Sequence, residues 1–329
     1  MEDALIRANA MHRKYYAADA HFDLGAELYE RKRRGETDIL KEYIPQWDKI
    51  GLKLVVVSVF LRNSELGEGA LRRTLEQIAL IKEAVGLHQD KVMMVLGAED
   101  LIKCLNGPKT GFVLYLEGLD CIEDDVSLLP LLYELGVRGA ALTWSRENKL
   151  ATGCCRSTEN TDRRGSITKA GRSVVKKMKE LGMFIDASHL NDEGMRELLR
   201  EKKGNVLATH SNCRWVCNHY RNLSKELVKM IIKDGGIIGI NANSVLLGGD
   251  VRVMARHIYE MVKMAGINKV CIGLDLCDRY SCGEKEDVLS EYSQWILLTA
   301  HLFKLGMNEE EISKIMGKNL VNYLAGLLV

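Results

Sequence analysis

Histidine and acidic residues recur directly after apolar runs of this sequence, and the first example lies within residues 19–24. His21 and Asp23 stand two residues apart there, and the preceding residues 15–18 are typical of a short strand. Residues i and i+2 of a strand project from the same face. An imidazole and a carboxylate would then point at one place, which makes half of a site for a divalent metal ion. A single His-x-Asp pair is common by chance, so the prediction depends on further ligands.

Four more residues of these types follow other apolar runs, namely Glu117, His189, His210 and Asp275. Taken alone, each is better explained as a helix cap or the start of a turn. Taken together, the six residues place three of the eight histidines at predicted strand ends. A buried carboxylate is costly unless a cation or a hydrogen-bond donor compensates it. The joint placement therefore predicts a metal site.

The number of candidate ligands indicates two metal ions. Six residues exceed the three or four ligands that one zinc ion requires. A two-metal centre fits better, with a carboxylate between ions that lie roughly 3.5–4 Å apart. In such centres a water molecule loses a proton near neutral pH and becomes the nucleophile, while the metals polarise the scissile carbonyl group. The predicted chemistry is hydrolysis.

Short apolar strands alternate with amphipathic helices and would position these residues. After the first strand we predict strands at 52–60, 91–96, 111–116, 137–142, 183–187, 205–209, 236–241 and 269–274. Nearly continuous apolar runs fit parallel strands that are buried on both faces. The alternation, repeated about eight times, favours a (β/α)8 TIM barrel with the site at the C-terminal ends of the strands. An open doubly wound sheet stays an alternative because there are nine candidate strands; in a barrel, 91–96 would be an accessory strand.

Helical spacing is found at 71–85, 126–135, 171–181, 192–201, 224–233 and 251–264, followed by 290–303 and 308–328. Ser224 is expected to be the N-cap of its helix. Five of the eight histidines fall outside the predicted strand ends. Among these, we interpret His88 and His257 as surface residues and His301 as a structural residue of a C-terminal helix.

Composition narrows the class of protein. The 329 residues are 47% hydrophobic and are expected to form one domain, 1–329. A net charge of +1 gives no argument for nucleic acid or an anionic membrane surface, and no apolar run is long enough to span a membrane. Nine irregularly spaced cysteines without a CxxC pair predict reduced thiols and a cytoplasmic location. A homo-oligomer is left open.

The motifs also agree in order and spacing with a known family. They are Asp19-x-His21-x-Asp23-Leu24, Glu117-Gly118, Leu142-Thr143, Ile185-Asp186-x-Ser188-His189, Thr209-His210-Ser211, Arg221-Asn222, Ile272-Gly273-Leu274-Asp275 and Gly317-Lys318-Asn319-Leu320. Over nearly its whole length, the chain resembles the membrane (renal) dipeptidase family of zinc peptidases, M19, among the amidohydrolase-like metal-dependent barrels. The resemblance implies a metallo-dipeptidase with two divalent ions, most simply Zn²⁺.

The resemblance also implies roles for the metal ligands. His21 and Asp23 would bind one zinc ion, His189 and His210 the other, and Glu117 would bridge the two.

Two more residues take implied roles in catalysis and substrate binding. Asp275 would be the acid/base that protonates the leaving amine. Arg221 would bind the free C-terminal carboxylate of a dipeptide, a contact that a guanidinium can make through two hydrogen bonds. Without the resemblance, Arg221 reads as a solvated loop charge.

Two positions depart from the family pattern. Trp144 stands where the family has a histidine that contacts the reacting carbonyl, and an indole N–H can donate a hydrogen bond but cannot become cationic. Cys277 and Asp278 stand where the family has a second aspartate and a glycine. The alternatives are therefore a related amidohydrolase acting on an N-acyl amino acid or a lactam, or a metal-binding barrel with reduced turnover.

Overall fold

The computed structural model describes residues 1–154, 166–200, 205–277 and 287–328. Its strands are β1 (Ala17–Phe22), β2 (Leu52–Phe60), β3 (Val92–Met94), β4 (Thr110–Glu117), β5 (Val137–Ala141), β6 (Phe184–Asp186), β7 (Val206–Leu207), β8 (Ile238–Ile240) and β9 (Val270–Ile272). All the pairings are parallel, in the order β7-β6-β5-β4-β2-β1-β9-β8. β3 pairs with β4 off this path, so the accessory strand predicted at 91–96 is confirmed.

The two ends of this strand order meet and close the sheet. Ala208, directly after β7, forms a parallel bridge with Ile238 of β8. The Gly239 N–H donates to the Ala208 carbonyl at 2.7 Å, and the Ser211 N–H donates to the Gly239 carbonyl at 2.7 Å. Glycine is required at 239, because a Cβ there would lie 1.9 Å from the Thr209 carbonyl oxygen. The predicted (β/α)8 barrel is confirmed, and the open sheet is excluded.

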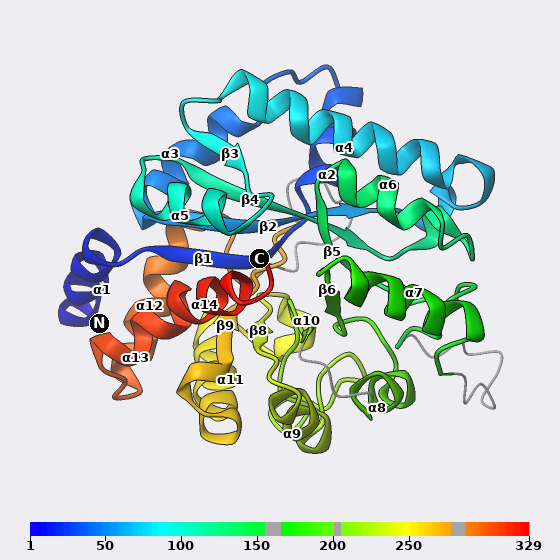
Figure 1. Ribbon diagram of the computed structural model, residues 1–329. Helices are drawn as coiled ribbons and strands as arrows, with labels where there is room; N and C mark the ends of the chain where they lie inside the picture. Colours follow the sequence, from blue (N-terminus) through cyan, green and yellow to red (C-terminus); the bar gives the residue numbers. More distant parts are fainter. Residues whose placement is uncertain (155–165, 201–204, 278–286, 329) are drawn as a thin grey trace.

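Helices surround the barrel (Figure 1). They are α1 (Glu2–Lys14), α2 (Leu24–Arg33), α3 (Leu40–Ile50), α4 (Ala70–Leu87), α5 (Ala98–Asn106), α6 (Leu128–Glu134), α7 (Lys169–Glu180), α8 (Asp192–Arg200), α9 (Lys225–Lys233), α10 (Ser244–Leu247), α11 (Val251–Ala265), α12 (Trp295–Lys304), α13 (Glu309–Ser313) and α14 (Asn319–Ala325), with a π-helical turn at Lys314–Lys318. Ser224 caps α9 by accepting from the Leu227 N–H, as predicted.

Four helices in the N-terminal third of the chain, α1, α2, α3 and α5, were not predicted. The sequences of α2 and α3 explain why a helix was not expected there. The buried face of α2 includes Glu27 and Arg31, which form an ion pair at 2.9 Å, so it has no apolar stripe. Pro45 lies inside α3, where a proline normally argues against a helix. In both cases, packing in the folded protein stabilises a helix that the local sequence does not indicate.

The core has an inner and an outer layer. Successive residues of β2 alternate between them: Leu54 and Val56 belong to the inner cluster, and Val55 and Val57 to the outer one. The inner cluster also contains residues of α14. Asn319, the first residue of α14, donates to the carbonyl of Val270, the first residue of β9, at 2.7 Å. α14 therefore covers the N-terminal end of the barrel and leaves the C-terminal end available for a site.

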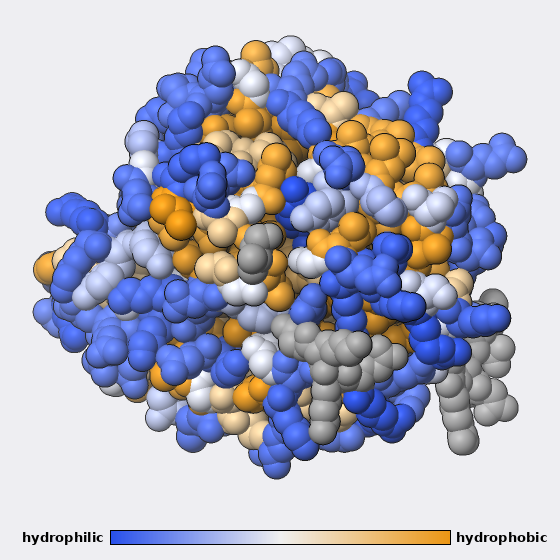
Figure 2. Space-filling model, in the orientation of Figure 1, coloured by the Kyte–Doolittle hydropathy of each residue, from blue (hydrophilic) through white to orange (hydrophobic). Residues whose placement is uncertain are grey.

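Hydrophilic residues cover most of the face shown in Figure 2, and hydrophobic residues show in smaller patches, most evident in its upper half. This pattern fits amphipathic helices packed around a barrel. Among the helices of the described residues, none has both the length and the apolar character needed to cross a bilayer.

Candidate metal centre

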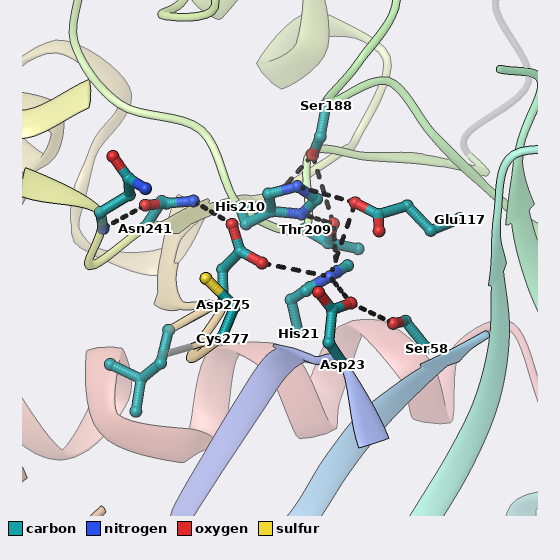
Figure 3. A network of polar contacts seen from close by, with 12 residues as sticks. His21, Asp23, Ser58, Glu117, Ser188, Thr209, His210, Asn241, Asp275 and Cys277 are labelled. Atoms are coloured by element: carbon teal, nitrogen blue, oxygen red, sulfur yellow. Dashed lines mark hydrogen bonds and ion pairs between the residues drawn. The ribbon is translucent and has the colours of Figure 1, made fainter. Parts of the chain in front are cut away.

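The six predicted ligand-type residues all lie at the C-terminal ends of strands. His21 is the next-to-last residue of β1, Asp23 directly follows that strand, and Glu117 is the last residue of β4. The other three, His189, His210 and Asp275, each lie three residues beyond the ends of β6, β7 and β9. The polypeptide brings all six to one place, and Figure 3 shows five of them around a common centre.

Glu117 lies in the middle of the group. Its Oε1 atom is 2.8 Å from Nε2 of His189, 3.3 Å from Nε2 of His210 and 3.6 Å from Nε2 of His21. One carboxylate oxygen thus faces His189 and His210, which form one half of the site, and His21, which belongs to the other half. This is the position that a bridging ligand would occupy.

The other half of the site is built on His21. Its Nε2 atom is 3.2 Å from Oδ1 of Asp23 and 3.6 Å from Oδ1 of Asp275. Three overlapping sets have ligand atoms within 4.8 Å of one another: His21, Asp23 and Glu117; Glu117, His189 and His210; and His21, His210 and Asp275. Sets of three to four nitrogen and oxygen ligands of this kind suit a transition metal such as zinc.

The electrostatics of the cluster favour a bound cation. Burial and the nearby Asp23 charge raise the pKa of Glu117 well above its usual value. Burial opposes the charged form of His21, but Glu117, Asp23 and Asp275 outweigh it and raise the pKa of His21 to about 10. Several carboxyl groups therefore lie close together in a buried place, and a bound cation there would stabilise their negative charges.

The two remaining histidines are suited to bind as neutral rings. Burial, together with positive groups nearby, lowers the pKa of His189 and of His210 well below the usual value. Their Nε2 atoms face each other at 2.9 Å. A neutral imidazole with a free lone pair is the form that binds a metal ion. The donor set therefore fits divalent metal ions.

Further side chains orient the ligands from behind. Ser58 donates to Asp23. The Nδ1 atom of His189 lies 2.7 Å from the Ser145 hydroxyl, and that of His210 lies 2.6 Å from the Thr209 hydroxyl. These contacts hold the far nitrogen of each ring and leave Nε2 for the centre, as is usual for metal-binding histidines.

Asp275 is held by two neighbouring strand ends. Its backbone has φ +59°, and its N–H donates to the His21 carbonyl at 3.1 Å. Asn241 donates from Nδ2 to Oδ2 of Asp275 at 2.7 Å. Burial is the main cause that raises the pKa of Asp275 to about 7, and Asp23 adds to it. A carboxyl group with this pKa can both take and give a proton near neutral pH.

Asp19, the first residue of the motif, has a structural role behind the site. It is fully buried and accepts from the N–H groups of His21 at 3.2 Å and Leu274 at 2.9 Å and from the Tyr292 hydroxyl at 2.7 Å. Burial raises its pKa to about 6, although these donors act in the opposite direction. Asp19 thus fixes the end of β1 to the loop that carries Asp275.

Arg221 and Trp144 both lie beside the cluster. The Arg221 guanidinium is buried and donates to the Ser211 hydroxyl at 2.9 Å and to the His210 carbonyl at 3.0 Å. It is not the solvated charge that the residue pattern alone favoured. The Trp144 ring stacks on His189 with 5.4 Å between centroids, and the Arg146 guanidinium lies 5.5 Å from the centroid of the Trp144 ring.

One sequence interpretation was wrong. His257 is buried, not a surface residue: its Nδ1 atom accepts from the Cys213 N–H at 3.0 Å, and its Nε2 atom donates to the Leu247 carbonyl at 3.0 Å. His88 and His301 are partly exposed. Asp278 lies outside the described residues.

Sequence reasoning also missed the residues that support the ligands. Asn241, Ser58, Ser145 and the Asp186–Thr209 pair were not assigned any role. Asn241 ends a predicted strand, so its position resembles those of the ligands, whereas Asp186 is an acid inside an apolar run. No comparable signal marks Ser58 or Ser145.

The chain is similar to a protein family and to curated relatives. The model of the membrane dipeptidase family matches residues 5–325. An uncharacterized dipeptidase of Schizosaccharomyces pombe is 29% identical over 260 residues, which cover 76% of this chain and 61% of that protein. Dipeptidase tcpJ of Claviceps purpurea is 24% identical over 260 residues, which cover 78% and 60%. The aligned regions span about three fifths of the length of these two relatives.

Solved structures share the fold. A metallo peptidase from Rhodobacter sphaeroides, liganded with a phosphinate mimic of the dipeptide L-Ala-D-Ala, has a TM-score of 0.85 at 19% identity and covers 96% of this chain and 99% of that one. An amidohydrolase from Pseudomonas aeruginosa has a TM-score of 0.81 at 21% identity, with coverage of 98% and 99%. On the match of the family model to nearly its whole length, this chain belongs to the membrane dipeptidase family, peptidase family M19.

Proposed function

We propose that the protein is a metal-dependent dipeptidase that uses two divalent ions, with Zn²⁺ as the expected metal. The observation that carries the proposal is the position of Glu117, whose Oε1 atom faces histidines of both halves of the cluster at 2.8–3.6 Å. Family membership and the dipeptidase names of the curated relatives support it.

The proposed ligands are divided between two ions as the family resemblance implies. His21 and Asp23 would hold one ion, His189 and His210 the other, and Glu117 both. The ions would supply Lewis acidity, which acidifies a water nucleophile and polarises the scissile carbonyl.

Asp275 is the proposed acid/base. It is the only one of the six whose side chain is appreciably exposed, at 22%, so it can reach a substrate. Its Oδ1 atom lies beside His21, while Asn241 occupies its Oδ2 atom. It would take the proton of the attacking water and deliver it to the leaving amine.

Two residues would bind substrate. Arg221 is proposed to hold the free C-terminal carboxylate, and its hydrogen bond to the His210 carbonyl supports a binding point beside the metal cluster. Such a binding point would favour substrates of dipeptide length. Trp144, stacked on His189, is proposed to form an apolar wall beside the reacting carbonyl. Because it cannot become cationic, stabilisation of negative charge on the carbonyl oxygen would fall mainly to the metal site.

The proposal is tested by hydrolysis of matched substrates by zinc-loaded protein. Dipeptides with a free carboxylate should be cleaved, and the same dipeptides with a C-terminal amide should show a strongly reduced kcat/KM. Equal rates for both would contradict the role of Arg221. Cleavage of N-acyl amino acids or lactams without cleavage of dipeptides would favour the related amidohydrolase. The cytoplasmic location expected from the cysteines stays a prediction.

A further inference from the structure

Thr209 lies between two proposed metal ligands and a buried carboxyl group. Its hydroxyl oxygen is 2.6 Å from Nδ1 of His210 and 3.4 Å from Nδ1 of His21. The same hydroxyl donates to Oδ2 of Asp186 at 2.6 Å. All four side chains are buried, and Figure 3 shows Thr209 next to His210 and Ser188. One hydroxyl group therefore contacts ligands from both halves of the proposed centre.

The contacts of Asp186 determine where the Thr209 proton points. Its Oδ1 atom accepts from the N–H groups of Ser188 and Thr209, both at 3.0 Å, and from the Ser188 hydroxyl at 2.7 Å. Its Oδ2 atom accepts from the hydroxyls of Thr209 and Tyr115, both at 2.6 Å. Five donors around one carboxyl group suit an ionised carboxylate, which can only accept. The single hydroxyl proton of Thr209 is thus directed to Asp186.

The neighbouring hydroxyl groups of Tyr115 and Ser188 do not change the direction in which the Thr209 hydroxyl donates. The Tyr115 hydroxyl donates its only proton to Oδ2 of Asp186 at 2.6 Å. Ser188 donates its hydroxyl proton to Asp186, and its hydroxyl oxygen accepts from the backbone N–H of His210 at 3.1 Å. Neither residue therefore competes to reverse the Thr209 hydroxyl.

A hydroxyl whose proton is committed can only accept at its oxygen from the histidines. His210 must then carry its ring proton on Nδ1, which leaves a lone pair on Nε2. The Nδ1 atom of His21 lies 3.4 Å from the same oxygen. We infer that Thr209, held by Asp186, is a positioning residue that sets the tautomer of His210, so that this ring presents Nε2 to the metal ions. This inference rests on the proposed metal centre.

His189 is held in a less restrictive way. The Ser145 hydroxyl lies 2.7 Å from its Nδ1 atom and 3.4 Å from the Cys154 sulfur, and in the second pair either atom can donate. The proton of Ser145 can therefore turn either way. The Ser145 contact therefore does not dictate which nitrogen of His189 is protonated, whereas the Thr209 contact does so for His210.

Three variants separate this role from simple packing. Thr209→Val removes the hydroxyl and keeps the shape, whereas Thr209→Ser keeps the hydroxyl. Asp186→Asn should reverse the direction of the hydrogen bonds that Thr209 makes with residue 186 and with His210. Because the Oδ1 position accepts two backbone N–H groups, the amide oxygen must stay there and the NH₂ group must face Thr209. The Thr209 proton would then turn to Nδ1 of His210, and the ring proton would move to Nε2 and block the ligand.

The effect is measured as zinc affinity, by competition with a chromophoric chelator, and as ring ¹⁵N chemical shifts of the metal-free protein. We expect Thr209→Val and Asp186→Asn to weaken zinc binding by about 10–100-fold, and Thr209→Ser to retain it. Asp186→Asn should also move the His210 signals from the Nδ1–H to the Nε2–H pattern. The matched control is Thr299→Val, because Thr299 pairs with His12 at 2.9 Å outside the site; it should leave zinc affinity unchanged.

The outcomes separate this inference from the proposed function. If wild-type protein binds zinc and Thr209→Val binds it equally tightly with unchanged His210 shifts, the inference is wrong and the metal centre stands. If the wild-type protein itself binds no zinc, the proposed function fails first. If Asp186→Asn does not fold, because it also holds two backbone N–H groups, Thr209→Val and Thr209→Ser decide the question.

Discussion

Asn241 donates from Nδ2 to Oδ2 of Asp275 at 2.7 Å, and the other carboxylate oxygen of Asp275 lies 3.6 Å from Nε2 of His21. One oxygen is thus fixed by an amide and the other is directed at the proposed metal centre. This division suits a group that exchanges protons at the centre while its orientation stays constant.

Asp275→Asn should separate proton transfer from metal binding. The amide keeps the shape of the carboxylate but cannot take a proton from water, so we expect kcat to fall by about 10²–10⁴-fold. Metal content, measured by elemental analysis, should stay at the wild-type value. Full activity would contradict the acid/base role, and loss of metal would identify Asp275 as a ligand instead.

Glu117→Gln should lower the metal content. The carboxylate faces three histidines with one oxygen, and a neutral amide is a much weaker ligand for two cations. We expect fewer than two ions per chain after dialysis, against two for the wild type. Circular dichroism should show an intact fold, because the substitution is nearly isosteric. An unchanged stoichiometry of two would refute the bridging role.

Trp144→His tests the departure from the family pattern. A histidine there could donate as a cation to the reacting carbonyl oxygen, so turnover of simple dipeptides should rise. Trp144→Phe is the matched control, because it keeps an aromatic ring against His189 without any N–H donor. Rates that do not increase in Trp144→His would show that the pocket has been rebuilt around tryptophan.

Acid should destabilise the protein through His12, far from the site. Its ring contacts the Ile50 carbonyl at 3.0 Å and the Thr299 hydroxyl at 2.9 Å. Burial lowers its pKa below 6.5, although the bond to Ile50 acts in the opposite direction. The unfolded chain therefore binds a proton that the folded protein refuses. The stability that a neutral His12 provides is full above about pH 6.5 and is lost as the pH falls toward the lower folded pKa.

Urea unfolding of wild type and His12→Gln between pH 7.5 and 5 measures this contribution. The free energy of unfolding of the wild type should fall more steeply below about pH 6.5, by up to about 1.4 kcal/mol per pH unit, the value for one proton. Comparing the two proteins at each pH cancels the acid sensitivity of all other groups. Parallel curves would show that His12 titrates equally in both states.

The barrel and the position of the six ligand-type residues could be predicted because both depend on local pattern. Apolar runs mark buried parallel strands, and polar residues just beyond them must meet at one end of a barrel. The burial of His257 also follows from local pattern. This residue lies three residues after Met254 and four before Met261, on the buried stripe of α11, so its burial could have been read from helical spacing.

Other features depend on contacts between distant segments, and no local pattern encodes them. The pairing of β1 with β2 shifts register between Asp19 and Phe22, at the position of His21. The contact of Thr209 with His21 joins residues 188 positions apart. Such distances are fixed only when the barrel closes, which is why the ligands were predicted and the residues that orient them were not.

Elemental analysis of the purified wild-type protein, paired with hydrolysis of dipeptides that end in glycine or alanine, tests whether the cluster around Glu117 is a catalytic two-metal centre. We expect close to two zinc ions per chain, together with turnover of these dipeptides. A protein that binds no metal tightly, even after zinc has been supplied, would contradict this expectation, because the cluster around Glu117 would then not be a metal centre.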